Sequence, residues 1–238
     1  MNSRRKFLLQ GSMATTALLI SNPFQTIADA GFPIEGLTGT TKKITFLHTG
    51  NLAGLGHDEI RKDINACKNN SDVVLLDATA ITTDAGINFA YDASISKTNP
   101  VSGTANNFRI IYKGNIKIGV VSAIPADADV ISQINNLSDY LKKDRNCHFV
   151  VCLSQLGYKN KNKIDDRSLA EASTSLDLII GGDTTNHSKQ PAILLNKNNA
   201  EVVISHSTGK DPALSQVEVA FNKLGNKNGF AFNNTFQS

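Results

Sequence analysis

Cysteine is scarce in this 238-residue chain, which contains only three: Cys67, Cys147 and Cys152. An odd number excludes a fully paired disulfide framework. Cys147 and Cys152 flank an apolar run at an odd separation, which predicts side chains on opposite faces of a strand and no bond between them. We therefore expect buried thiols that contribute packing.

The sequence also lacks a long apolar run and a concentrated basic surface. The run Leu8–Ile20 is interrupted by polar residues and is shorter than the roughly 20 residues that a membrane-spanning helix needs. Lysines in 159–163 alternate with asparagines, as in a solvated loop. We therefore expect that the chain has no nucleic-acid partner. We also expect that it is not an integral membrane protein once the leader is removed.

The first thirty residues have the order of an export signal. Ser3–Leu8 (SRRKFL) resembles a twin-arginine signal, the apolar run follows, and Ala28–Ala30 (ADA) is a small-residue cleavage site. This predicts recognition by the twin-arginine translocase and a periplasmic or extracellular protein. Cleavage after Ala30 leaves 208 residues and lowers the net charge from +3 to +1, because the leader holds three basic residues and one acidic residue.

The rest of the chain alternates short apolar runs with amphipathic segments. Residues 31–42 have the composition of a linker, 43–221 of one folded domain, and 222–238 of a polar tail. No repeat or low-complexity block interrupts the domain. The aperiodic stretch 79–107 is long for a connection without a functional role.

The domain mixes parallel and antiparallel signals. Helices are predicted over 57–69, 127–144 and 165–173. Strands are expected over 43–48, 72–77, 149–153, 176–180 and 214–221, and hairpins over 108–121 and 192–206. β-α-β units beside two hairpins predict an α/β sandwich of two mixed β-sheets flanked by helices.

Five motifs follow one another along the domain: Leu47–Gly54 (LHTGNLAG), Leu75–Ala80 (LLDATA), Gly114–Val120 (GNIKIGV), Leu153–Gly157 (LSQLG) and Asp177–Thr185 (DLIIGGDTT). In this order they resemble the metallophosphoesterase domain of the 5′-nucleotidase family, which belongs to the calcineurin-like phosphoesterases. The family reads LHTNDxHG, LLDAGD, NGxKIGV, LSHLG and DxIIGGHxH at these places.

The resemblance implies a site that has lost its chemistry. Carboxylates and histidines that hold two metal ions in the family fall here on Asn51, Ala53, Ala80, Gln155, Asp183 and Thr185. We also expect no counterpart of the family's GNH[ED] segment or of its second, nucleotide-binding domain. Neutral amides cannot offset two divalent cations as carboxylates do. We therefore expect no dinuclear centre, no catalytic residue, no cofactor, and a role in binding a small ligand or a protein partner.

Two rival hypotheses remain open at this stage. Asp183, His187 and His206 could form a single site for one zinc, manganese or magnesium ion and support phosphoester hydrolysis. Ordinary turn chemistry also explains the segment Asp183–Asn186, and we favour it over a metal site. Alternatively, the chain could be a structural subunit that pairs with an active relative. His48 and Asp77 match family positions that are not metal ligands, and we interpret both as structural.

Overall fold

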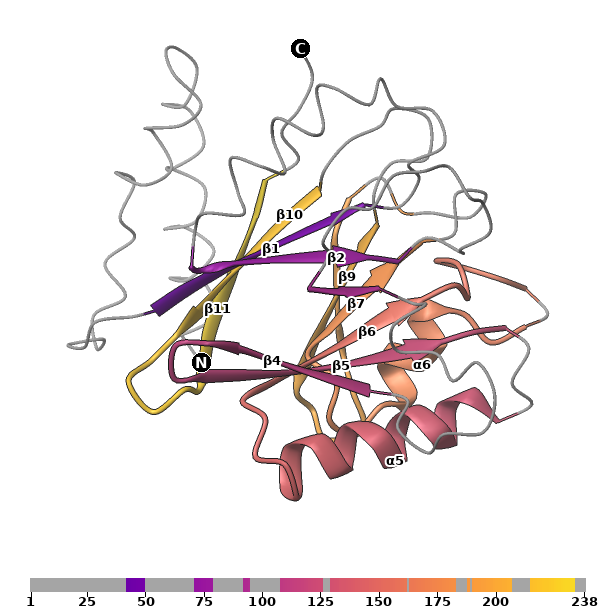
Figure 1. Ribbon diagram of the computed structural model, residues 1–238. Helices are drawn as coiled ribbons and strands as arrows, with labels where there is room; N and C mark the ends of the chain where they lie inside the picture. The colour runs from indigo at the N-terminus through magenta and orange to yellow at the C-terminus, as the bar shows by residue number, and fades with distance from the viewer. Residues whose placement is uncertain are drawn as a thin grey trace, which may run out of the picture. The chain divides into compact units, whose positions relative to one another are not determined.

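Two β-sheets lie face to face in the computed structural model, and the two helices found among the residues that it describes lie on the outer side of one sheet (Figure 1). The structure describes residues 42–49, 71–78, 92–94, 108–125, 129–161, 163–182, 188, 190–206 and 215–233, all within the unit Gly39–Ser238. Neither helix in this described part is long and apolar enough to cross a membrane.

The smaller sheet has five strands in the order β11-β10-β1-β2-β3. β1 pairs parallel with β2 and antiparallel with β10. The strands are β1 (Lys42–Thr49), β2 (Val73–Asp77), β3 (Ala93–Ser94), β10 (Ser215–Phe221) and β11 (Lys227–Asn233).

The larger sheet has six strands in the order β4-β5-β6-β7-β9-β8. β5, β6, β7 and β9 are mutually parallel, and an antiparallel strand pairs at each edge. The strands are β4 (Phe108–Lys113), β5 (Ile116–Ala123), β6 (Phe149–Ser154), β7 (Leu178–Gly181), β8 (Ala192–Leu195) and β9 (Glu201–His206). The predicted sandwich of two mixed sheets is confirmed.

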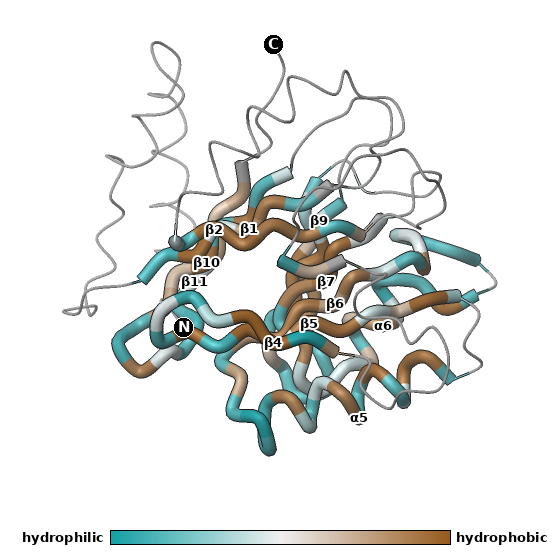
Figure 2. Tube along the Cα trace, viewed as in Figure 1, coloured by the Kyte–Doolittle hydropathy of each residue, from teal (hydrophilic) through white to brown (hydrophobic). Residues whose placement is uncertain are grey.

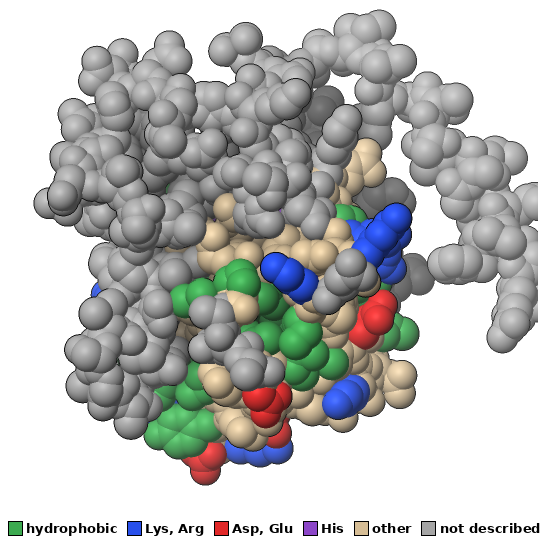
Figure 3. Space-filling view, turned by 90° about the vertical axis from the view of Figure 1, so that its right-hand side faces the viewer, with side chains coloured by type: hydrophobic (Ala, Val, Ile, Leu, Met, Phe, Trp, Pro, Cys, Tyr) green, Lys and Arg blue, Asp and Glu red, His purple; other side chains and the backbone are tan. Residues whose placement is uncertain are grey.

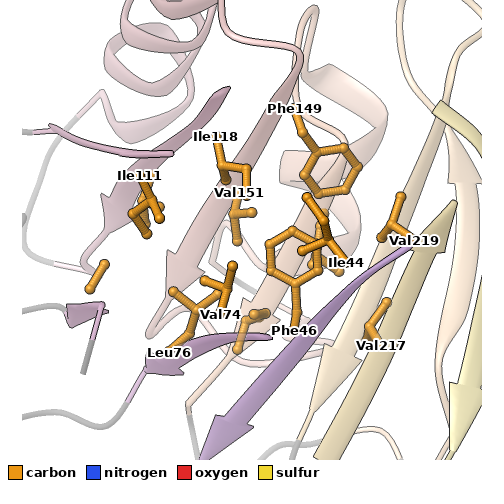
Figure 4. Close-up of a cluster of buried hydrophobic side chains, with 14 of the residues drawn as sticks. Ile44, Phe46, Val74, Leu76, Ile111, Ile118, Phe149, Val151, Val217 and Val219 are labelled. Carbon is orange, nitrogen blue, oxygen red and sulfur yellow. The ribbon is translucent and has the colours of Figure 1, made fainter. Parts of the chain in front are cut away.

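The main core fills the space between the sheets (Figure 4). Alternate residues of β1, including Ile44 and Phe46, face inward because side chains of a strand alternate between its faces. Phe46 stacks on Phe149 of the opposite sheet with ring centroids 5.2 Å apart. Such a pair contributes about 0.5–1.5 kcal/mol beyond the apolar area that it buries. In Figure 2 hydrophobic residues, drawn in brown, accordingly recur along the strands of both sheets.

A second core lies between the larger sheet and the helices α5 (Val130–Lys143) and α6 (Asp166–Ala172). α5 buries Val130, Ile134 and Leu141, which recur at helical spacing. α6 begins with a capping box, in which the Asp165 carboxylate accepts from the Ser168 amide and the Ser168 hydroxyl accepts from the Asp165 amide.

Local turn chemistry agrees with both predicted hairpins. Gly114 adopts φ +61° at the first position of the two-residue loop between β4 and β5, a conformation that glycine accepts without strain. In the β8–β9 loop the buried Asn196 carboxamide accepts from the amides of Asn198 and Ala200. The predicted helix over 57–69 and most of the stretch 79–107 lie outside the described residues.

Two features differ from the sequence expectation. β11 lies inside the segment 222–238 that we expected to be a polar tail. Phe230 and Phe232 alternate along it and pack against the core, but the polar residues Lys227, Asn228 and Asn233 around this short apolar run hide the strand signal. Cys147 and Cys152 enter the same helix-side cluster, because Cys147 precedes β6 and does not follow its alternation. Both thiols are free and buried, as expected.

Candidate functional site

The carboxyl ends of the parallel strands of both sheets meet at one edge of the sandwich. Ala78 follows β2 in the smaller sheet, whereas Gln155 and Gly182 follow β6 and β7 in the larger sheet. In open α/β sheets ligands bind at such an edge. The sequence analysis placed its candidate site residues here.

Gln155 joins the two sheets at this edge. Its Nε2 donates a hydrogen bond to the main-chain carbonyl oxygen of Ala78, and its own main-chain amide donates to the carbonyl of Ala123 at 2.9 Å. The resemblance assigns this position to a metal-binding histidine. Here the Gln155 side chain instead binds to the backbone of the other sheet.

Gly182 completes this contact because it leaves no room for a side chain. A Cβ at residue 182 would collide with the carbonyl group of Ala78 and with the carboxamide of Gln155. The main-chain amide of Gly182 donates to the carbonyl of Ser154 at 2.8 Å. The three chain segments therefore pack at backbone distance, which only glycine allows.

His48 and Ser205 form a second bridge between the sheets, deeper in the core. His48 Nε2 and Ser205 Oγ lie 2.9 Å apart, and neither residue is more than 2% exposed. Burial, followed by the proximity of His206, lowers the pKa of His48 to about 3. His48 is therefore neutral at physiological pH, and its complete burial gives it a structural rather than a catalytic position, as expected.

A buried Ser154, Asp166 and His206 cluster lies on the opposite, helix-covered face of the larger sheet. The Ser154 hydroxyl donates to Asp166 Oδ1, and His206 Nε2 lies 3.0 Å from Asp166 Oδ2 without a hydrogen bond between them. The His206 ring lies over Gly181 and meets Tyr158 edge-on. No motif in the sequence indicated this cluster.

This cluster cannot act as a nucleophilic triad. In a serine–histidine–aspartate triad the imidazole lies between the hydroxyl that it deprotonates and the carboxylate that orients it. Here the carboxylate lies between the hydroxyl and the imidazole, and all three side chains are buried. The cluster anchors the start of α6 to the ends of β6 and β9.

Of the candidate site residues, the structure describes only Gln155 and His206. Asn51, Ala53, Ala80, Asp183, Thr185 and His187 lie outside the described residues. His206 directs its ring toward Asp166 under the helices, and its side chain has no exposed area. Within the described ranges no three histidine, cysteine, aspartate or glutamate residues are grouped so that they could hold a metal ion.

Figure 3 shows the side to which β5 and β6 point, and hydrophobic patches alternate there with single lysine, arginine and acidic side chains. No histidine is visible among the described residues of this face. Asp77, the carboxylate at the end of β2, is 7% exposed.

Comparison with solved structures identifies the same fold in two nucleotidases. The chain matches the NAD nucleotidase NadN of Haemophilus influenzae with a TM-score of 0.59 and 14% identity, over 81% of this chain and 55% of that one. It matches the 5′-nucleotidase precursor of Thermus thermophilus with a TM-score of 0.59 and 13% identity, over 80% of this chain and 54% of that one.

These matches establish the architecture and nothing finer. The chain spans about half the length of the two nucleotidases. No protein-family model matches it, and no curated protein matches it by sequence. The fold is therefore the 5′-nucleotidase-like, metallophosphoesterase-like sandwich that the ordered motifs predicted.

Proposed function

We propose that this chain is an exported relative of the 5′-nucleotidase-type metallophosphoesterase domain that does not hydrolyse phosphoesters. It binds a small ligand or a protein partner at the carboxyl edge of its sheets. The observation that carries this proposal is the contact of Gln155 with Ala78. A carboxamide that donates to a buried main-chain carbonyl across the sandwich performs a structural role at a position where the family needs an imidazole.

The chemistry of the donor set supports the proposal. A dinuclear phosphoesterase holds two cations about 3.5–4 Å apart and needs several anionic ligands to stabilise them. The six residues at the corresponding positions provide one carboxylate, Asp183, beside two amides, one hydroxyl and two alanines. This set does not fit a dinuclear centre, so we derive no reaction step through one.

A metal analysis combined with an activity assay tests the loss of catalysis. The full mature chain is dialysed against manganese, zinc or magnesium, assayed on a generic phosphomonoester and phosphodiester, and analysed for bound metal. The control is a Lys143→Gln chain from which a chelator has removed all metal. We expect the turnover of the metal-treated chain to be no higher than that of this control, and we expect it to bind no stoichiometric metal. Stoichiometric metal with turnover that His187→Ala abolishes would overturn the proposal and favour the mononuclear hydrolase.

The export route has a separate test. Replacing Arg4 and Arg5 together by lysine keeps the charge of the leader but removes the twin-arginine feature on which the proposal rests. We expect the unprocessed chain to accumulate inside the cell, whereas Lys6→Arg serves as the matched control and is exported. Normal export of the double variant would contradict the twin-arginine route. It would not bear on the proposal that the carboxyl edge of the sheets binds a ligand or partner.

A further inference from the structure

Two exposed tyrosines and two cations form a cluster at the end of the larger sheet opposite the candidate site. We name Tyr112, Lys117, Tyr140 and Arg145 the tyrosine–arginine patch. Tyr112 and Lys117 are paired across the β4–β5 hairpin, near the start of β5, while Tyr140 and Arg145 lie at the end of α5. The exposed fractions are 64% for Tyr112 and 37% for Tyr140, values that mark large aromatic rings held in solvent.

Specific contacts hold the patch in place. Arg145 Nη1 donates to the Tyr140 hydroxyl at 3.3 Å, and the Tyr140 ring packs on Phe108 with centroids 5.7 Å apart. The Lys117 ammonium lies 5.7 Å from the centre of the Tyr112 ring and donates to the main-chain carbonyl of Arg145. Little side-chain entropy is therefore left to lose on binding, which favours affinity.

The two cations have no acidic partner among the described residues. Lysines elsewhere on the same elements do: Lys113 is 3.7 Å from Asp92, Lys142 is 2.7 Å from Asp177, and Lys143 is 2.7 Å from Asp139. Neither Lys117 nor Arg145 forms such a pair in the described ranges. Both charges are therefore available to an anion from outside.

The patch adjoins an edge strand. Within the described part of the chain β4 pairs only with β5, and an edge strand directs every second N–H and C=O group away from its partner. Phe108, Ile110 and Tyr112 alternate along the helix-side face of β4. A strand added beside β4, about 4.8 Å away, would place its own alternate side chains next to these residues and next to Arg145.

We propose that the tyrosine–arginine patch and the edge of β4 bind an extended acidic segment of a partner protein. Main-chain hydrogen bonds along β4 supply the register, the tyrosines supply contact area, and Lys117 and Arg145 select carboxylates. Tyrosine and arginine dominate the binding energy of many protein interfaces. The site lies at the amino ends of the parallel strands, so it is separate from the carboxyl edge of the proposed function.

The probe for this proposal is a ten-residue peptide of alternating glutamate and threonine, compared with one of alternating lysine and threonine. Binding to the full mature chain is followed by amide resonances and by tyrosine emission, which is unobscured because the chain contains no tryptophan. We expect the acidic peptide alone to shift the amides of Ile110 and Tyr112. Added salt should weaken its binding, because both cations are half-buried at the surface, where dissolved ions screen them.

Variants identify the residues that select the anion. Arg145→Gln and Lys117→Gln each weaken the acidic peptide about tenfold, and Arg145→Lys weakens it less because one charge remains. Lys143→Gln is the matched control, since it removes the same charge from α5 outside the patch, and it changes the affinity less than twofold. Equal binding of both peptides, no effect of Arg145→Gln in a folded chain, or resonance shifts confined to other strands would each overturn the proposal.

Discussion

Gln155 Nε2 donates a hydrogen bond to the carbonyl oxygen of Ala78, and this contact joins residues 77 positions apart that follow strands of different sheets. Ala78 is completely buried. Loss of the carboxamide would leave this buried carbonyl without its side-chain donor, and an unpaired buried acceptor costs free energy.

We therefore expect Gln155→Ala to lower the free energy of unfolding by about 1–3 kcal/mol. Urea denaturation followed by circular dichroism measures the change. Gln133→Ala, an exposed glutamine-to-alanine change on α5, provides the control and alters stability by less than about 0.5 kcal/mol. A loss at Gln155 no larger than the loss at Gln133 would show that the contact contributes nothing.

Gly182 and Gly229 form a matched pair for testing the close approach of the sheets. A Cβ at Gly182 meets the Ala78 carbonyl group, whereas a Cβ at Gly229 in β11 meets nothing within 4 Å. Gly182→Ala should destabilise the fold by about 1–3 kcal/mol, because backbone has to move. Gly229→Ala should be neutral or stabilising by up to about 1 kcal/mol. Equal unfolding midpoints for the two variants would contradict the close approach of Gly182 to Ala78.

The pKa of His48 predicts how stability depends on pH. The pKa of this imidazole is 6.5 in the unfolded chain and about 3 in the folded chain. Between these values the unfolded state holds the extra proton, so the stability that neutral His48 contributes is complete above pH 6.5 and is lost as the pH falls toward 3. Its contribution to the slope is about 1.4 kcal/mol per pH unit.

Urea titrations from pH 4 to pH 7 measure this slope in the parent chain and in His48→Gln, which cannot take up the proton. We expect the variant to have the shallower dependence. In the parent chain the His48 ring resonance should stay constant between pH 5 and pH 8. A ring titration with a midpoint near 6.5 would rule out the buried neutral state.

Asp177 connects three elements at the amino end of the larger sheet. Its carboxylate lies 2.7 Å from Lys142 of α5 and 3.3 Å from Lys227 of β11, and it accepts from the Val150 amide of β6 at 2.8 Å. Asp177→Ala should cost about 1.5–3 kcal/mol of unfolding free energy, as expected for hydrogen bonds to a charged group.

The exposed Asp144→Ala change is the control for Asp177→Ala, with an effect of less than about 0.5 kcal/mol. Hydrogen exchange adds a local measurement, because the amides of β11 should lose protection when Lys227 loses its partner. Unchanged protection of β11 would show that Asp177 does not hold this strand.

Much of the fold was predictable because its signals are local. The apolar runs that became β1, β2 and β6, the Gly114 loop and the buried stripe of α5 each depend on residues close in sequence. Side-chain alternation and helical spacing follow from backbone geometry alone. β11 was not predicted, because an edge strand buries only part of its surface. Its two phenylalanines therefore lie among polar residues.

The candidate site was predictable in part. The sequence identified which residue types occupy the carboxyl edge, including the glutamine at position 155 and the paired glycines at the end of β7. It could not show that His206 directs its ring away from this edge, toward Asp166 beneath α6. That direction depends on which face of β9 the helix covers, and this is a property of the packed layers.

By itself, the sequence determined most of the secondary elements, their order, the sandwich architecture and the chemistry that the edge residues can provide. Only the tertiary structure decided what these residues contact: Gln155 with Ala78, His48 with Ser205, and Asp166 between Ser154 and His206. The physical reason is that local backbone preferences select strands and helices, whereas a hydrogen-bond partner many residues away is fixed only when two sheets bury a common core.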